Sequence, residues 1–282
     1  MKDLPNPTFP LSFIAMPPVS AQAALLDTPI ARPEALGGSS GAGLSVAWAC
    51  HLDEVREAQR LRFKVFANEM GAQLATPLPG HDIDLFDPFC EHLLVRDVST
   101  GEVVGTYRVL TPAQARRVGS TYSDLEFDLT RIRSLRDRTV ELGRSCVHAD
   151  YRQGAVIMSL WAALASFMDR NKLDTMIGCA SIPMHYQGMK TGAAAASIWH
   201  QLKQKHLAPI EHQVHPRLAL PLGSFDSTLP VEAPALIKGY LRLGAKIMGP
   251  PAWDPDFNSA DLPMLLRIED MAPRYRRHFL GA

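Results

Sequence analysis

The chain has 282 residues, of which 46% are hydrophobic, and its 29 lysine and arginine residues balance its 29 aspartate and glutamate residues. This length and composition predict a folded, enzyme-sized protein, and the zero net charge gives no reason to expect a nucleic-acid partner. The four cysteines lie far apart without a Cys-x-x-Cys pair, which argues against a disulfide framework and favours a reducing, cytoplasmic setting. The longest apolar run, residues 155–168, is too short to span a bilayer.

Residues 1–45 are rich in Pro, Ala, Ser and Gly, and they include the run GGSSGAG. Such a segment cannot bury a regular apolar face, so we predict a flexible N-terminal arm followed by one domain over residues 46–282. The domain is expected to open with a strand at 45–50 and a helix from Asp53 to about Asn68, with acidic residues in its first turn. The run HLLVRDVSTGEVVGTYRVL then predicts two antiparallel strands joined by a Ser-Thr-Gly turn.

The stretch from Thr139 to Phe167 changes from a strand pattern to a Gly-bearing turn and then to a long apolar helix. A helix that begins at such a turn offers unpaired backbone N–H groups, which suit a phosphate or the polar arm of a pantetheine. A strand at 175–182 completes a β–α–β unit. We further expect helices at 193–206 and 233–247, an irregular strand at 213–220 and a last strand at 262–268. This order predicts one α/β or α+β domain with a mixed sheet and helices on its faces.

Two groups of polar residues precede this stretch. Arg62, Phe66 and Glu69 fall on one side of the first helix, where they would point to the same place; an ordinary amphipathic helix with solvated charges has the same spacing. Asp84 and Asp87 bracket an apolar pair in a loop, and two close carboxylates attract an ammonium group.

Three charged residues lie within apolar strands. Arg108 needs either a carboxylate partner in the protein or a carboxylate ligand. Glu141 and Arg144 would lie on opposite faces of a regular strand, so a bulge near Gly143 is needed to bring them together; a salt bridge at the sheet edge is the alternative. His206, His212 and His215 lack the spacing of a known metal motif, and no metal site is predicted.

In this order, the motifs LRFKVF, DLFD, GTYRVL and ELGRSCVHADYRQGAVI resemble the acyl-homoserine-lactone-synthase-like branch of the GNAT acyltransferase superfamily. The likeness is strongest to the bacterial L-ornithine Nα-acyltransferases of ornithine-lipid biosynthesis, and it extends from about Leu52 to the C-terminus. It implies a GNAT fold and transfer of a 3-hydroxyacyl chain from acyl carrier protein to the α-amine of L-ornithine, giving lyso-ornithine lipid. The family's motif positions imply two sets of site residues. Glu141 and Arg144 are expected to be catalytic, and substrate binding is expected from Arg62, Phe66, Asp84, Asp87 and Arg108.

The turn before the long helix departs from the usual GNAT pattern, because it has a single glycine where coenzyme A-binding members have more. This departure favours the 4′-phosphopantetheine of a carrier protein as the donor arm, with no other cofactor. The residues expected to hold the donor are Val147, Arg152, Gln153, Gly154 and Ala155. The tryptophan that lactone synthases have after the first motif is absent from Met70-Gly71-Ala72, which makes S-adenosylmethionine a poor acceptor.

The resemblance also suggests roles for single residues. Glu141 would take a proton from the amine, directly or through one water. Arg108 or Arg144 would bind the carboxylate of ornithine, and Asp84 or Asp87 its side-chain ammonium. Trp161 and Phe167 are candidates for lining the acyl chain, although packing in the core is the commoner use of such residues.

Three other functions fit the same sequence: an acyl-homoserine-lactone synthase, an N-acyltransferase for glycine, lysine, glutamine or another amino acid, and a non-enzymatic module that binds a carrier protein or lipid. Peripheral contact with the inner membrane is expected through the basic, amphipathic segment 235–248 and the C-terminal run RYRRHF. Docking of the acidic carrier protein is the alternative use of this surface.

Overall fold

The computed structural model describes residues 43–189 and 191–280. The arm predicted at 1–45 therefore lies almost wholly outside the described residues, and strand β1 (Leu44–Trp48) includes its last two positions. Within the described ranges, no helix is both long and apolar enough to cross a membrane.

Eight strands in the described part of the chain form one sheet, in the order β1-β2-β3-β5-β6-β10-β8, with β9 paired to β10. β5 and β6 are parallel, whereas the other pairs in this sheet are antiparallel. The mixed sheet predicted from the sequence is confirmed. The strands are β2 (Glu91–Asp97), β3 (Val103–Leu110), β5 (Thr139–Val147), β6 (Thr175–Pro183), β8 (Lys246–Ile247), β9 (Ala252–Asp254) and β10 (Ser259–Arg267); β4 (Phe127–Asp128) and β7 (His215–Pro216) form a separate two-stranded sheet.

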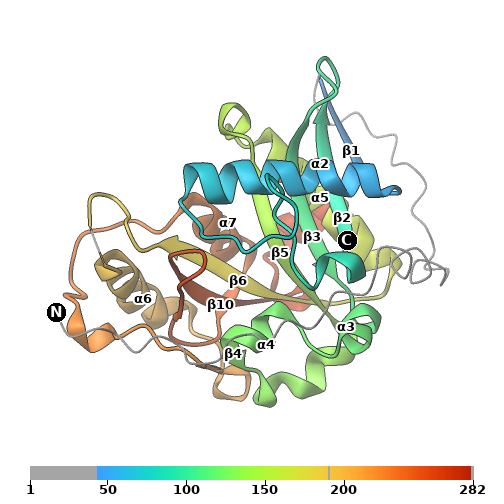
Figure 1. Ribbon diagram of the computed structural model, residues 1–282. Helices are drawn as coiled ribbons and strands as arrows, with labels where there is room; N and C mark the ends of the chain where they lie inside the picture. Colours follow the sequence, from blue (N-terminus) through green and yellow to red (C-terminus); the bar gives the residue numbers. More distant parts are fainter. Residues whose placement is uncertain (1–42, 190, 281–282) are drawn as a thin grey trace. The chain divides into compact units, whose positions relative to one another are not determined.

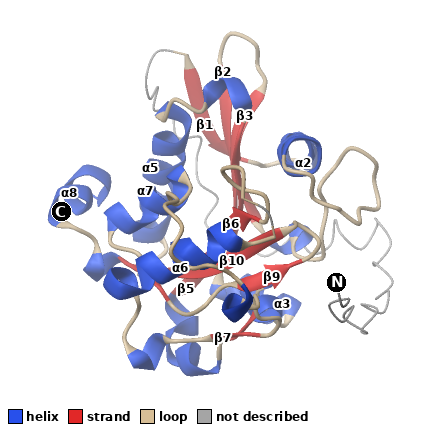
Figure 2. Ribbon diagram, turned by 90° about the vertical axis from the view of Figure 1, so that its left-hand side faces the viewer, coloured by secondary structure: helices blue, strands red, loops and turns tan. Residues whose placement is uncertain are grey.

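Helices cover both faces of the sheet. α2 (Leu52–Phe63) crosses one face, while α5 (Ala155–Arg170), α7 (Ala235–Leu243) and α8 (Pro273–Leu280) lie on the other (Figures 1 and 2). α3 (Pro112–Val118) and α4 (Tyr122–Glu126) connect β3 to β5, and α6 (Ala193–His206) follows β6. A π-helix (Lys64–Glu69) prolongs α2, and short 3₁₀ helices occupy Asp87–Phe89, Thr130–Arg138, Ala149–Tyr151, Ile210–His212, Leu222–Ser224 and Ile268–Asp270.

The apolar periodicity of α5 explains its position. Val156, Leu160 and Phe167 lie on one side of the helix and pack against the β1–β3 part of the sheet, where Trp48 and Phe167 have ring centroids 4.7 Å apart. On the opposite face, α2 and its π-helical extension contribute Leu61 and Val65 to a smaller buried cluster. The strands are thus packed between α5 on one face of the sheet and α2 with its π-helical extension on the other.

Several boundaries differ from the sequence prediction. The helix expected at 233–247 ends at Leu243, because Gly244 adopts a left-handed φ of 114° and the chain turns into β8. The strand expected at 213–220 is reduced to the two residues of β7. In α7, Ile237 and Leu243 are buried, so much of the apolar side proposed for membrane contact packs against the protein. The exposed basic residues Arg274 and Arg277 of α8 keep that proposal open.

The sheet opens between β5 and β6. Their parallel pairing covers Thr139–Glu141 and Thr175–Ile177 and then stops. β5 contains one extra residue opposite β3, because the register jumps from the pair Arg108–Gly143 to the pair Thr106–Cys146. Arg144, inside this bulge, has a φ of 50°. The bulge predicted near Gly143 is confirmed, and it turns the strand away from its neighbour.

Candidate acyl-transfer site

A cavity of about 770 Å³ occupies the gap between β5 and β6. Its lining includes residues 142–147 of one strand and 176–181 of the other. It also includes residues of the π-helix that prolongs α2 on one face of the sheet, and residues of α5, α7 and α8 on the other. The cavity therefore passes through the sheet. Its volume is within the range of sites that hold a small molecule or the arm of a cofactor. The side chains on the α5 face are mostly apolar: Ile157, Trp161, Leu164, Met168, Leu236, Leu243, Leu266, Met271 and Phe279.

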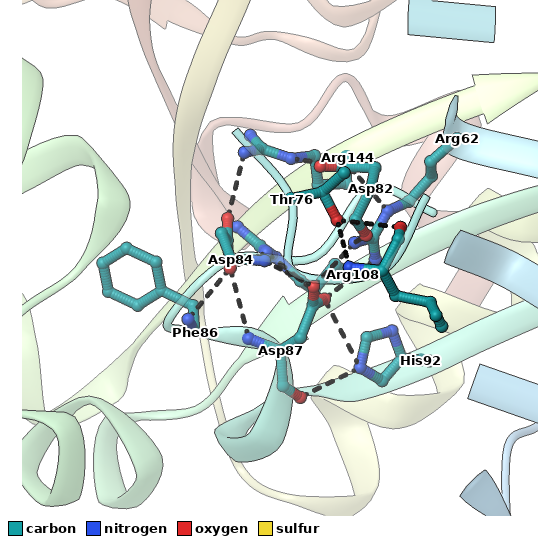
Figure 3. Close-up of polar contacts among 10 residues, drawn as sticks. Arg62, Thr76, Asp82, Asp84, Phe86, Asp87, His92, Arg108 and Arg144 are labelled. Atoms are coloured by element: carbon teal, nitrogen blue, oxygen red, sulfur yellow. Dashed lines mark hydrogen bonds and ion pairs between the residues drawn. The ribbon is translucent and has the colours of Figure 1, made fainter. Parts of the chain in front are cut away.

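On the α2 face, buried charges form one connected network beside the cavity (Figure 3). The side chain of Arg62 is completely buried, and its Nε donates to Oδ2 of Asp82 at 2.8 Å. Its two terminal nitrogens donate to the two carboxylate oxygens of Asp87 at 2.9 and 2.8 Å. Such a two-pronged pairing is among the strongest that a guanidinium makes, and these charges hold the pKa of Asp87 well below its usual range despite burial.

Arg108 and Arg144 complete the network. Arg108 donates to Oδ1 of Asp84 at 2.6 Å, and Arg144 donates to Oδ2 of Asp82 at 3.1 Å and to Oδ2 of Asp84 at 3.0 Å. The bulge makes this possible, since the left-handed Arg144 aims its side chain along the α2 face. Three arginines thus face three aspartates, and their formal charges cancel.

This pairing changes the roles expected for five residues. The sequence predicts substrate binding for Arg62, Asp84, Asp87 and Arg108, and a catalytic or carboxylate-binding role for Arg144. Each of these residues has protein partners inside the network. Asp87 and Arg108 have side chains that are only 3% and 4% exposed, so they support the wall of the site. Asp84, at 21%, and Arg144, at 10%, are the more accessible members. Only Arg144 and Arg108 of the five also line the cavity.

Two aromatic rings and a histidine contact members of the network. The Arg144 guanidinium lies 4.5 Å from the ring centroid of Phe257 and 4.9 Å from that of Tyr122. His92 makes a hydrogen bond with the carbonyl oxygen of Asp87 at 3.1 Å, and burial lowers its pKa to about 4, so the imidazole is neutral at pH 7. The network therefore gains no extra positive charge from histidine. Phe66, the remaining acceptor-side prediction, lines the cavity and packs edge-on against Phe257 with centroids 5.6 Å apart.

Glu141 lines the cavity at the point where β5 and β6 separate. Its side-chain oxygens accept hydrogen bonds from the backbone N–H groups of Tyr122, at 2.7 Å, and Ser123, at 2.6 Å. Burial raises the pKa of the carboxyl, while these hydrogen bonds oppose the rise. Each oxygen keeps a second lone pair, so the group can both hold the start of α4 and accept a proton.

Two further carboxylates on the cavity wall were not predicted from the sequence. Asp254 and Asp261 are 4% and 2% exposed, and Asp254 accepts a hydrogen bond from the Tyr122 hydroxyl at 2.7 Å. Among the described residues, no lysine, arginine or histidine nitrogen forms an ion pair with either of them or with Glu141 within 4.0 Å. Burial, followed by the charge of Asp254, raises the pKa of Asp261 to about 6. Because the arginines are already balanced, this end of the cavity carries an excess of negative charge.

The turn before α5, which the sequence predicts to hold the acyl donor, lies at the cavity lining. Gly154 adopts a φ of 108° and the helix begins at Ala155, which leaves the first N–H groups of a 16-residue helix available for a ligand. Arg152 donates to the carbonyl oxygen of Val147 at 3.0 Å and pairs with Glu69 at 2.5 Å. Gln153 donates to the carbonyl oxygen of Asp150 at 2.9 Å. Of the predicted donor residues, Val147, Arg152, Gln153 and Gly154 line the cavity, whereas Ala155 does not.

The two aromatic residues considered for the acyl chain have different positions. Trp161 lines the cavity, whereas Phe167 is 4% exposed and packs in the core against Trp48. Phe167 is therefore a core residue. Among the described residues, no group of three or more His, Cys, Asp and Glu side chains is arranged to hold a metal ion.

Comparison of the sequence with known proteins identifies the family of this chain. Residues 61–162 match the family model of the acetyltransferase (GNAT) domain. An L-ornithine Nα-acyltransferase from Rhodobacter capsulatus is 35% identical over 240 residues, which cover 80% of this chain and 90% of the relative. The chain belongs to the L-ornithine Nα-acyltransferase family. A second member, from Brucella abortus, is 33% identical over 80% of this chain and 84% of its own length.

The fold of this family member also resembles that of a solved lactone synthase. The AHL synthase LasI superposes with a TM-score of 0.50 at 13% identity, covering 86% of this chain and 97% of that structure. At this identity the likeness concerns the fold alone. It agrees with the GNAT-like, acyl-CoA N-acyltransferase architecture predicted from the motifs.

Besides Asp254, the structure brings two aspartates to the site that the sequence did not single out, Asp82 in the charged network and Asp261 on the cavity wall. Asp82 lies in the acidic segment HDIDLFD, but nothing in its spacing distinguished it from Asp84 and Asp87. Asp261 lies one position before the strand predicted at 262–268, although its flanking residues Ala260 and Leu262 have the alternation of a strand. An acidic residue within this apolar strand is the sequence signal that could have identified Asp261 as a candidate site residue.

Proposed function

We propose that this acyltransferase moves a 3-hydroxyacyl chain from acyl carrier protein to the α-amine of L-ornithine and produces lyso-ornithine lipid. The observation that carries this proposal is the cavity through the sheet. Carboxylates that have no cationic partner among the described residues lie at one end of it, and an apolar chamber forms the other. The names of the family members, L-ornithine Nα-acyltransferases, supply the acceptor. Such a cavity suits two ligands. The end with the carboxylates suits a cationic amine, and the apolar chamber suits a long acyl chain.

The donor arm enters at the turn before α5. The phosphate of the 4′-phosphopantetheine lies against the first N–H groups of α5, where the helix dipole favours an anion. The pantetheine follows β5 into the gap, and the acyl chain continues to the apolar chamber on the α5 face. The single glycine of the turn supports a carrier-protein donor over coenzyme A. Arg152, near the entrance, provides a cation that can exchange Glu69 for the phosphate.

The acceptor approaches from the α2 face. Asp254 and Asp261 bind the side-chain ammonium of ornithine, because two buried carboxylates without a cationic partner favour an ammonium over water. This assignment replaces Asp84 and Asp87, whose oxygens are held by arginines. Arg144, the more accessible guanidinium of the network, remains the candidate for the ornithine carboxylate.

The reaction is aminolysis of a thioester. The neutral α-amine attacks the thioester carbon, a C–N bond forms, and the C–S bond breaks to release the carrier thiol. Glu141 takes the proton from the amine, directly or through one water, and its raised pKa suits this role better than that of an ordinary carboxylate. Backbone N–H groups of the bulge at 143–145 stabilise the negative charge that develops on the carbonyl oxygen.

The substitution Asp261→Asn tests the acceptor assignment. We expect the KM for L-ornithine to rise about 30-fold, equivalent to about 2 kcal/mol, because a buried charge pair is lost. In the wild type, apparent ornithine affinity should increase from pH 5 to pH 7, since the carboxyl with a pKa of about 6 loses its proton over this range. In Asp261→Asn that pH dependence should disappear. Steady-state kinetics with purified protein measure both effects.

Two controls make this result specific. Norvaline has the α-amine and chain of ornithine but no side-chain ammonium, so its weak acylation should be unchanged or improved by Asp261→Asn. Asp169→Asn, at the exposed end of α5, changes the same charge away from the cavity and should leave the ornithine KM unaltered. An unchanged ornithine KM in Asp261→Asn would refute the assignment.

A cytoplasmic location with peripheral membrane contact completes the proposal. The product is an amphiphile, and Phe279 of α8 lines the apolar chamber close to the exposed cations Arg274 and Arg277. These charges would attract an anionic lipid surface to the chamber. Neutralising both arginines should reduce sedimentation with anionic vesicles and leave acyl transfer to soluble ornithine intact.

A further inference from the structure

Three hydroxyl groups meet on the α5 face of the cavity, in surroundings that are otherwise apolar. Tyr107, from β3, makes a hydrogen bond with Tyr240, from α7, and Ser145 of the β5 bulge lies within hydrogen-bonding reach of both. All three residues line the cavity. Burial raises the pKa of Tyr107 to about 12 and that of Tyr240 well above its usual value. Both phenols are therefore neutral donors at pH 7.

A fourth polar group lies in the same chamber without a partner. The indole nitrogen Nε1 of Trp161 is buried and has no hydrogen-bond partner among the described residues. Trp161 lines the cavity, and its ring centroid is 5.9 Å from that of Tyr240. Gly239 lets the indole ring approach α7, because a Cβ there would lie 2.7 Å from a ring carbon of Trp161. A buried N–H donor without an acceptor costs stability unless a ligand supplies the acceptor.

The position of these groups limits what they can bind. Ser145 follows Arg144 in the bulge beside which the thioester carbonyl is placed, so the hydroxyl cluster lies beside the first carbons of the acyl chain. A plain hydrocarbon would leave the indole N–H and the hydroxyls without a ligand partner. An oxygen on the chain can accept from the donors and, as a hydroxyl, donate to a phenol oxygen in return.

We propose that Tyr107, Tyr240, Ser145 and Trp161 form a specificity site that recognises a hydroxyl group near the head of the acyl chain. The site rests on the proposed function, because it takes the direction of the donor arm from it. The site lets the enzyme distinguish two acyl chains of equal length by the presence of a hydroxyl group on one of them. A site that hydrogen-bonds a substrate hydroxyl discriminates against the analogue without it, since a buried donor, here the indole N–H of Trp161, is then left unpaired.

Binding of two unreactive donor analogues tests this proposal without an acceptor. The probes are acyl-pantetheine amides of equal chain length, one with a hydroxyl on the third carbon and one without, titrated by calorimetry. The wild type should bind the hydroxylated probe at least about tenfold more tightly. Tyr240→Phe and Trp161→Phe should each reduce this ratio to about threefold or less, mainly by weakening the hydroxylated probe. Because the probes are measured without an acceptor, the affinity ratio can be determined even if the protein does not acylate ornithine.

Tyr186→Phe is the matched control. Tyr186 is a partly buried tyrosine that packs against the apolar cluster around Ile198 of α6, and it does not line the cavity. It should keep the wild-type ratio, and thermal melts should show that all three variants fold. Equal affinity of the wild type for the two probes would overturn the proposal. Equal weakening of both probes by Tyr240→Phe would also overturn it, because the cluster would then bind the pantetheine arm that they share.

Discussion

Replacing Glu141 by Gln should lower kcat for ornithine acylation about 10²- to 10⁴-fold, the usual contribution of a positioned general base. Without this group, the reaction depends on the fraction of ornithine whose α-amine is already neutral. Residual activity should therefore rise tenfold per pH unit up to the pKa of the amine, near 8 to 9. The wild type should reach its plateau at a lower pH. Rate measurements between pH 6 and pH 9.5 at saturating donor show the difference.

The pH profile separates catalysis from structure, because Glu141 also accepts the N–H groups of Tyr122 and Ser123. A purely structural role would reduce kcat at all pH values by the same factor and leave the profile unchanged. Glu91→Gln is the control, since Glu91 is a partly buried glutamate on β2 that lies outside the cavity lining and accepts from Gln114 at 2.8 Å. It should retain nearly full kcat.

Replacing Arg62 by Met should destabilise the fold by about 3–5 kcal/mol, because two buried carboxylates each lose the guanidinium that is completely buried with them. The side chain is 0% exposed and holds Asp82 and Asp87 together, so no water can replace the lost charge without rearrangement. The loss should appear as a lower midpoint of urea unfolding at pH 7, followed by circular dichroism. Arg60→Met, on the exposed side of the same helix, should change stability by less than about 0.5 kcal/mol.

The sign of the pH effect follows from the direction of the pKa shift. The pKa of Asp87 is lower in the folded state, so its contribution to stability is present above its unfolded pKa near 4 and is lost as the pH falls through the folded value. The wild type should therefore lose more stability than Arg62→Met between pH 5 and pH 3. Equal acid sensitivity of the two proteins would show that the Arg62 pairings contribute little.

Much of the fold could be predicted from local pattern. Strands and helices with strong periodicity, such as β5, α5 and α6, have the expected positions within a few residues. The β5 bulge was one of two alternatives that the odd spacing of Glu141 and Arg144 left open. The segment 112–138 was not predictable in this way. Its helices α3 and α4 are short, and the position of α4 is fixed by the distant Glu141 carboxylate.

The site was predictable in composition but not in pairing. The resemblance named five charged residues that the structure brings into one network, yet the sequence does not reveal that Asp82 joins Arg62 and Arg144. That neutral network emerges only when the bulge, the loop and α2 come together in space. The excess negative charge at Asp254 and Asp261 is visible only after these pairs have been subtracted. The choice of Asp254 and Asp261 for the ornithine ammonium therefore depends on the ion pairs of the folded protein.

The most direct measurement is mass spectrometry of the products formed when the purified protein receives a 3-hydroxyacyl carrier protein, an equimolar mixture of amino acids and S-adenosylmethionine. We predict one dominant product, an ornithine acylated on its α-amine, and a much lower yield when the coenzyme A thioester replaces the carrier protein. Acylation of glycine, lysine or glutamine in preference to ornithine, or formation of an acyl-homoserine lactone, would contradict the proposed function.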